Sequence, residues 1–387
     1  MQGRLFQSCE NSAAVRGDLT PGERVHAVAI SIASSPATHR VWSMMATMGP
    51  SEMYTAMASG KAPALQNYLA GRHPVGIIEA ARRIIEESDG KSIRIITYWD
   101  AEYPYLLREI PAPPVVLYLR GRFPRGPAVA VVGARKSDQR SSSHARRIAR
   151  DLAIRGYAVV SGMAVGVDRE AHLGALEGGG ATVGVLANGI DIAYPWQNRD
   201  IYRRIRESEA SALVSEYPPG TIAGRWTFVR RNRIISGLCA GTVVVKAGER
   251  SGALITARHA IDQNREVFAC AGYAFDGDYA GCHRLIRNGA VLVSSTDDII
   301  DELWYSCGIL PPAPAPGGQG EGEGHIPGGE PPDALEVLIL DLLGEGDRDI
   351  DSLVRATAVA PGAIHRAIMN LELRERVTRS GNTLSRK

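Results

Sequence analysis

Asp168 and His172 stand four residues apart in the segment VVSGMAVGVDREAH (159–172), at the start of a predicted helix. At that spacing they share one helical face, so they could form an acid–base pair or hold a divalent metal. Glu170 adds a second carboxylate between them. In the structural alternative, Asp168 caps the helix and His172 packs against the sheet. Because no third metal ligand stands at a recognisable spacing, the sequence favours the structural interpretation.

The same segment also has the character of a phosphate-binding loop. Ser161 and Gly162 end an apolar run and small residues follow, so backbone N–H groups lead into a helix N-terminus, which attracts anions. Two similar loops follow other apolar runs: VVGARKSDQRSSS with Arg135, and KAGERSGALITA with Ser251 and Gly252. None has the spacing of a dinucleotide fingerprint or of a Walker A motif. Together the three loops predict a site for another kind of phosphate.

The basic segment GRWTFVRRNRIISG (224–237) indicates which phosphate this is. It holds four arginines with Trp226, Phe228 and Asn232 interleaved, and we expect most of it to be a loop. Arginines that follow phosphates beside rings that stack on bases are typical of single-stranded nucleic-acid binding. A dinucleotide or ATP site needs fewer cations. Arg231 or Arg233 could instead form internal salt bridges, with one ring in the core.

The elements that must position these residues are alternating strands and helices. Helical stretches separate most of a series of apolar runs, at residues 128–133, 157–162, 182–187, 211–216, 241–246, 265–270 and 290–295. This pattern predicts an α/β fold, an extended Rossmann-like, doubly wound parallel sheet covered on both faces. Such sheets bind ligands at the carboxyl ends of their strands, where all three loops would lie.

Four domains are expected along the chain. Residues 1–90 read as a helical domain of the SAM or helix-hairpin-helix kind, and residues 91–308 as the Rossmann-like domain, which opens with an extended Pro-rich connector. A flexible Pro/Gly linker spans 309–332. Three helices and a turn in 333–387 predict a winged-helix-like domain. That domain could insert a helix into double-stranded DNA, or dock a protein.

Composition excludes several classes of protein. The net charge is +2, and 44 basic residues less five lysines leave 39 arginines, an excess that a GC-rich genome also explains. The five cysteines are an odd number without a Cys-x-x-Cys pair, which argues against a disulfide framework or a zinc site. No signal peptide or membrane-spanning run is apparent, so we expect a cytoplasmic protein with no membrane partner.

Long motifs in order along residues 97–295 resemble the DNA-processing protein A family, also called Smf. They are VVGAR, SGMAVGVDREAHLGAL, ANGIDIAYPWQN, VSEYPPG, FVRRNRIISGLCAGTVVVKA, SGALITARHA and NGAVLV. The flanking helical and winged-helix-like domains resemble the architecture common in this family. The resemblance covers about half of the chain.

The resemblance implies a non-enzymatic protein that binds single-stranded DNA, forms a homodimer and loads the RecA recombinase during natural transformation, with no cofactor or metal. Carried over by motif, the expected DNA contacts are Arg135, Ser161, Gly162, Arg225, Phe228, Arg231, Asn232, Ser251, Gly252 and Thr256. Arg230, in the same basic run, and Lys246, close to the last loop, are added as basic candidates. Two alternatives stay open. One is a nucleotide-processing enzyme that uses Asp168, Glu170 or His172, with GGGAT (178–182) as a loop; the other is a regulator that binds double-stranded DNA through the C-terminal domain.

Overall fold

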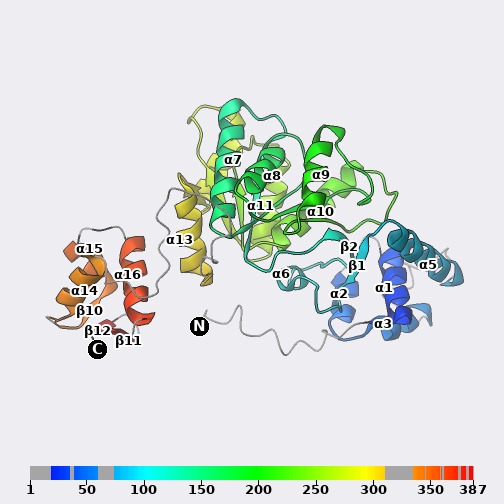
Figure 1. Cartoon of the computed structure of the whole chain (residues 1–387), viewed down its shortest axis with the longest axis horizontal. Coiled ribbons are helices and arrows are strands. Elements are labelled where there is room, and N and C mark those ends of the chain that lie inside the picture. The colour runs from blue at the N-terminus through cyan, green and yellow to red at the C-terminus, as the bar shows by residue number, and fades with distance from the viewer. Residues whose placement is uncertain are drawn as a thin grey trace. The chain divides into compact units, whose positions relative to one another are not determined.

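The fold is described from a computed structural model of the chain (Figure 1). The described residues are 19–34, 39–59, 74–309, 334–344, 346–357, 359, 361–373, 376–380 and 383–386. The chain divides into two compact units, residues 1–318 and 319–387, and each is described by itself.

The first unit is built on a nine-stranded sheet in the order β1-β2-β6-β5-β4-β3-β7-β8-β9. Its strands from β3 onward are mutually parallel, whereas β2 runs antiparallel to both of its neighbours, β1 and β6. The strands are β1 Arg94–Thr97, β2 Val116–Gly121, β3 Ala128–Val132, β4 Ala158–Ser161, β5 Thr182–Leu186, β6 Ala212–Ser215, β7 Gly241–Val244, β8 Glu266–Cys270 and β9 Val291–Val293. The predicted doubly wound parallel sheet is confirmed.

The parallel strands are buried on both faces, which explains their continuous apolar sequences. Successive side chains of a strand point to opposite faces. In β3, Ala130 and Val132 belong to one hydrophobic core, and Val129 and Val131 belong to the other. The sheet is therefore the middle layer between two cores.

Helices cover the two faces in sets. Most buried apolar side chains of α7, α8 and α13 lie in one core, and those of α9 to α12 lie in the other, together with Leu173 of α8. These helices are α7 Gln139–Ile154, α8 Val167–Glu177, α9 Arg199–Glu207, α10 Arg225–Gly237, α11 Ala253–Asp262, α12 Ala280–Arg287 and α13 Thr296–Cys307, with short 3₁₀ turns η1 Trp196–Asn198 and η2 Gly277–Tyr279.

The segment predicted as an extended connector is instead part of the sheet. It forms β1, the short helix α6 (Tyr105–Arg108) and β2, and β2 pairs antiparallel with β6. Tyr103 is buried, and its hydroxyl donates to the carbonyl of Pro114 at 2.8 Å, which closes the turn between the two strands. The prolines that suggested a connector lie in this turn and not in the strands.

The N-terminal helices pack into the same core as β1 and β2. They are α1 Pro21–Ala33, α2 His39–Met45, α3 Pro50–Ala58 and α5 Pro74–Gly90. Thr20 and Glu23 form a capping box at the start of α1, which satisfies N–H groups that the first turn leaves unpaired. The buried Trp99 donates its indole N–H to the carbonyl of Met48 at 2.8 Å and ties the segment after β1 to these helices.

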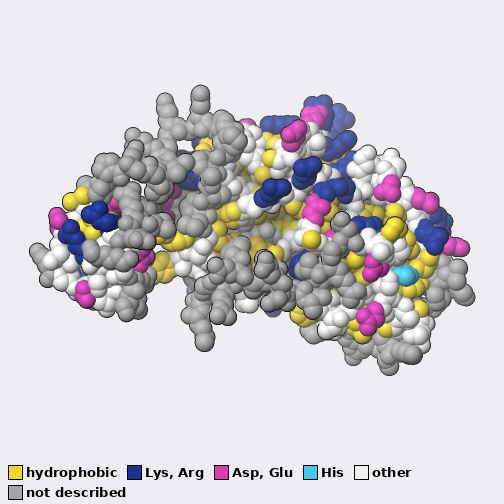
Figure 2. Space-filling view, turned by 60° about the horizontal axis from the view of Figure 1, so that its bottom comes forward, with side chains coloured by type: hydrophobic (Ala, Val, Ile, Leu, Met, Phe, Trp, Pro, Cys, Tyr) yellow, Lys and Arg dark blue, Asp and Glu magenta, His cyan; other side chains and the backbone are white. Residues whose placement is uncertain are grey.

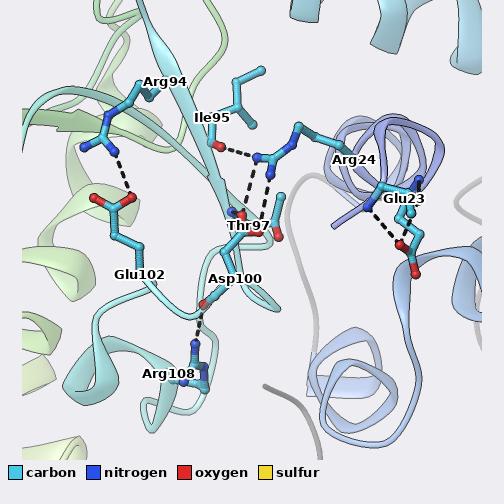
Figure 3. Close-up of polar contacts among 9 residues, drawn as sticks. Glu23, Arg24, Arg94, Ile95, Thr97, Asp100, Glu102 and Arg108 are labelled. Carbon is cyan, nitrogen blue, oxygen red and sulfur yellow. Dashed lines mark hydrogen bonds and ion pairs between the residues drawn. The ribbon is translucent and has the colours of Figure 1, made fainter. Parts of the chain in front are cut away.

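Polar side chains occupy the outer edge of β1 (Figure 3). Arg24 of α1 donates to the carbonyl of Ile95 at 2.6 Å, and Asp100 accepts the N–H of Thr97 at 2.7 Å. Arg24 and Asp100 also form an ion pair at 3.4 Å. Because backbone groups of an edge strand invite pairing with another strand, these contacts protect this end of the sheet.

The second unit has three helices and a three-stranded antiparallel sheet in the order β10-β12-β11. Its elements are α14 Ala334–Gly344, β10 Arg348–Asp349, α15 Ile350–Thr357, α16 Pro361–Leu373, β11 Val377–Ser380 and β12 Thr383–Arg386. A small core that includes Ile339, Leu353, Ile368 and Leu384 joins them. This arrangement confirms the predicted winged-helix outline.

Candidate nucleic-acid interface

The three predicted anion loops meet at the carboxyl edge of the sheet. The β3 loop (residues 133–138), the β4 loop (162–166) and the β7 loop (245–252) follow three adjacent strands in the order β4-β3-β7. Strands β4 to β6 are added on one side of β3 and strands β7 to β9 on the other, so the strand order reverses between β3 and β7. Doubly wound sheets bind ligands at such a switch point. The fold therefore places all three loops where a ligand site is expected.

The basic segment is a helix and not the loop that the sequence predicted. α10 begins at Arg225, and Thr227 closes its first turn by accepting the N–H of Gly224 at 2.9 Å and donating to the carbonyl of the same residue at 2.8 Å. The helix divides the segment by periodicity. Arg225 and Trp226 are exposed, whereas Arg231 and Arg233 are buried.

Arg135 and the rings beside it form the exposed part of the site. The guanidinium of Arg135 lies over the ring of Phe228, 4.9 Å from its centroid. The ring of Tyr194, from the segment after β5, lies 6.0 Å from that of Phe228. Trp226 is 58% exposed, and its ring packs edge-on against Tyr217. Cation and rings thus share one surface, which can contact phosphates and unstacked bases together.

The β4 loop turns its carbonyl groups away from this surface. The carbonyl of Gly162 accepts hydrogen bonds from Arg231, and Asn198 donates to those of Met163 and Ala164 at 2.8 and 2.9 Å. Gly166 has φ +83°, and a Cβ there would lie 2.5 Å from the carbonyl oxygen of Ala134. Carbonyl oxygens repel a phosphate, so sequestering them makes the loop more favourable for an anion.

Arg231 is buried, with 4% of its surface exposed, and holds neighbouring backbone groups in place inside the site. Its guanidinium donates to the carbonyls of Gly162 and Val185. Burial lowers the pKa of Arg231 to about 10, and the nearby Asp168 opposes that shift. Inside the protein, Nη1 of Arg231 donates to both carbonyls and Nε donates to Asn232. Direct contact of this buried side chain with DNA stays a prediction.

Asn232 extends this internal connection to the β7 loop. Its side-chain oxygen accepts from Nε of Arg231 at 3.2 Å, and its amide nitrogen lies 3.5 Å from the carbonyl of Gly252. Gly252 itself is exposed, and Ser251 is half-buried. Through Arg231 and Asn232, α10 thereby links the β4 and β7 loops. These two side chains set the spacing between two of the predicted anion sites.

Lys246 does not present a free positive charge at the sheet edge. Its ammonium is bonded to the carboxylates of Asp138 at 2.7 Å and Asp278 at 2.8 Å, and the side chain is 4% exposed. Burial lowers the pKa of Lys246, but the two carboxylates outweigh it and the net shift is upward. One cation with two anions carries a net charge of −1. This triad (Lys246, Asp138, Asp278) therefore carries a net negative charge, and contact of Lys246 with DNA stays a prediction.

Ser161 and Thr256 are also buried, at 0% and 2% exposure. The hydroxyl of Ser161 donates to the carbonyl of Val131 at 2.7 Å, across the neighbouring strand. Arg233 is paired with Glu216, which also lies 3.9 Å from Arg230. The alternative of internal salt bridges is confirmed for Arg233. Both side chains lie in the interior, so burial does not support direct DNA contact by Ser161 or Thr256.

Asp168 and His172 form no acid–base pair with each other. The helix cap is Gly166 and not Asp168, which lies inside α8 and accepts the N–H of Ala164 at 3.3 Å. Burial raises the pKa of Asp168. His172 is fully buried, with Nδ1 2.7 Å from the hydroxyl of Thr182, and burial together with Arg231 lowers its pKa to about 3. The structural interpretation of His172 holds.

The structure does not bring the residues of the nucleotide-processing alternative together into a site. Residues 178–182 (GGGAT) join the end of α8 to the start of β5, so this turn precedes a strand, as its sequence position suggested. Within the described ranges, no group of three or more His, Cys, Asp or Glu side chains is arranged to hold a metal ion. The described helices also include none with the length and apolar character needed to cross a membrane.

Sequence reasoning missed three contributors to the site. Asn198 holds the β4 loop, Asp278 pairs with Lys246, and Tyr194 adds a ring beside Phe228. Asn198 and Tyr194 belong to the motif ANGIDIAYPWQN, so the motif itself carried a signal. The sequence carried no such signal for Asp278, because it lies 32 positions beyond its partner Lys246, in the short 3₁₀ turn η2.

Comparison with known proteins agrees with this geometry. The profile of DNA recombination-mediator protein A matches residues 94–304, and that of the DprA winged helix domain matches residues 326–382. The chain is 34% identical to Protein Smf of Synechocystis sp. over 317 residues, which cover 75% of this chain and 79% of the relative. It is 35% identical to DNA processing protein DprA of Bacillus subtilis over 246 residues, which cover 63% and 80%.

A solved structure is similar as well. DNA processing protein A (DprA) from Streptococcus pneumoniae superimposes with a TM-score of 0.58 at 30% sequence identity, covering 72% of this chain and 97% of that chain. The first profile alone matches more than half of the chain and includes the whole carboxyl edge described above. The chain therefore belongs to the DNA recombination-mediator protein A family.

Proposed function

We propose that this recombination mediator binds single-stranded DNA at the carboxyl edge of its sheet and loads a RecA recombinase onto the bound strand during natural transformation. The observation that carries the proposal is the stacking of Arg135 on Phe228, 4.9 Å from the ring centroid, with Tyr194 beside it. A duplex keeps its base faces stacked inside, so only a single strand can use these rings.

The remaining contacts of the strand would come from backbone groups and exposed cations. The β4 loop has its carbonyls sequestered, and Arg225 is exposed at the start of α10. Ser251, Gly252 and Asn232 would approach the strand from the β7 side. The role is binding and not catalysis, which is consistent with the buried, hydrogen-bonded state of His172.

We further propose a homodimer formed through β9. This strand is the end of the sheet opposite β1, and Leu292 within it is 46% exposed. The β1 end is occupied by Arg24 and Asp100. An exposed apolar side chain on an unprotected edge strand is a typical pairing surface.

The function is tested by titrating the full chain against labelled oligo-dT and against a duplex of equal length, over a range of salt concentrations. We expect tighter binding to the single strand, with an affinity that falls steeply as salt rises. Equal affinity for the duplex, or an affinity independent of salt, contradicts the proposal. RecA loading is measured as RecA ATP hydrolysis on DNA that is already coated with single-strand-binding protein, where adding this protein should shorten the lag.

A further inference from the structure

The outer face of α9 carries arginines that the proposed site does not use. The isoleucines of α9 are buried against the sheet, whereas Arg199, Arg203 and Arg206 are exposed. Their spacing of four and three residues places all three on one face of the helix. At 1.5 Å per residue this stripe, defined here as the α9 stripe, is about 10 Å long.

The positive charge of the α9 stripe is almost unbalanced. Asp200, the acidic residue in the first turn, is held by Arg169 of α8 at 2.8 Å, so its charge is already compensated. Arg203 lies 3.9 Å from Glu207, an exposed pair of the kind that contributes little. Arg199 and Arg206 form no ion pair with any residue in the described part of the chain.

The α9 stripe continues directly from the proposed site. α9 follows η1, which holds Trp196 with 70% of its surface exposed, and Tyr194 just before it lies beside Phe228. At the far end, Arg206 lines a groove of about 480 Å³ together with Arg122, Glu207 and Glu209. Figure 2 shows several Lys and Arg side chains in the upper part of the face in view, with a few acidic side chains among them. Rings and cations thus follow one another along the surface.

We propose that the α9 stripe binds the phosphate backbone of the DNA strand that leaves the carboxyl-edge site. This inference rests on the proposed function, which supplies the first part of the strand's path. Solvated arginines, two of which form no ion pair within the described residues, attract a polyanion through counterion release and require no particular sequence. The stripe itself has no aromatic residue, so it can follow phosphates but cannot stack bases. A strand long enough to pass Trp196 would gain this contact, and a shorter one would not.

The test compares Arg199→Gln/Arg206→Gln in the full chain with wild type, using oligo-dT of about 5 and of about 20 nucleotides, which bracket the usual footprint of a single-strand site. A matched control is Arg82→Gln/Arg83→Gln, which removes two exposed arginines from α5. We expect unchanged affinity for the short oligonucleotide. For the long one, the affinity should fall and the salt slope should become shallower by about 1.4, or 0.7 per lost phosphate contact.

Each other outcome decides against the proposal. The α9 variant could lower the affinity for short and long oligonucleotides equally, or the α5 control could lower the affinity for the long one as much. Either result means that the loss reflects the net charge of the protein and that the stripe does not bind the strand. If the α9 variant binds both lengths like wild type, the stripe serves another partner, such as an acidic protein surface. If wild type binds neither oligonucleotide, the proposed function itself fails, and this result is distinguishable because it appears before any substitution.

Discussion

The guanidinium of Arg231 packs on Gly162 so closely that a Cβ at residue 162 would lie 2.7 Å from its Cζ atom. The same guanidinium donates to the carbonyl of Gly162. One contact requires the absence of a side chain and the other uses the backbone, so the glycine and the arginine depend on each other. Through Asn232 this pair also reaches the β7 loop.

Gly162→Ala is expected to displace Arg231 and to destabilise the protein by about 1–3 kcal/mol, the usual cost of overpacking a buried site. Binding of oligo-dT should weaken as well, because the β4 loop moves. Urea unfolding and an anisotropy titration measure the two effects. Gly76→Ala on α5 is the control, since a Cβ there meets nothing within 4 Å. Equal stability of the two variants contradicts the role of the Gly162–Arg231 contact.

Phe228→Leu keeps an apolar side chain of similar size but removes the ring under Arg135. We expect single-strand affinity to fall by about 1–3 kcal/mol, the range found when one stacked base loses its aromatic partner. Duplex affinity should change little. Tyr305→Leu, which alters a ring with 68% exposure on α13, should leave both affinities as they are. A Phe228 variant that binds oligo-dT like wild type removes stacking from the proposed function.

Asp278→Asn is expected to strengthen single-strand binding. The triad around Lys246 carries a net charge of −1, and removing one exposed carboxylate makes it neutral toward an approaching phosphate. Affinity should rise and the salt slope should steepen, by up to about 0.7 if Lys246 gains a phosphate contact. Glu249→Gln removes an equal charge from the β7 loop without touching Lys246. If both variants gain affinity alike, the triad has no special part.

Stability should depend on pH through His172. Its pKa is near 3 in the fold against 6.5 when exposed, so the neutral ring is favoured by folding. The unfolded chain binds the extra proton first. This stabilisation is therefore complete above pH 6.5 and is lost as pH falls toward 3, at up to about 1.4 kcal/mol per pH unit. Urea unfolding from pH 7 to 4 should show a shallower slope for His172→Gln than for wild type, whatever the absolute stability of the variant. Identical slopes contradict this assignment.

Leu292→Glu places a charge on the β9 edge and is expected to convert a dimer into a monomer, because pairing would bury an unpaired carboxylate. Light scattering of the full chain measures the mass. Leu338→Glu is the control, since that leucine is similarly exposed, at 43% against 46%, but lies on α14. A wild-type monomer, or a dimer that survives the β9 change, excludes this interface.

The fold was largely predictable because its signals are local. Each parallel strand is a short apolar run between helices, and both faces are buried, so periodicity and length suffice. Two regions are exceptions: the basic segment, which forms α10 and not a loop, and the region of β1 and β2. β2 pairs with β6, about 95 residues further along the chain, and only that pairing makes a strand of a segment whose neighbours are prolines.

The site was predictable as a region but not residue by residue. Arg225 and Arg231 have the same side chain within one basic run, yet one is exposed and the other is buried. The difference arises from carbonyls at residues 162 and 185, which only the folded chain brings to Arg231. Lys246 is a second example. The carboxylates that pair with it lie 108 and 32 positions away in the sequence, and they make the local net charge negative.

The protection of β1 by Arg24 and Asp100 has a consequence for assembly. A sheet that could pair at both ends would add copy after copy and grow into a fibre. Here one end is closed by side chains of the same chain. Pairing through β9 would then stop at two subunits, because the closed β1 end offers no second edge for a third copy.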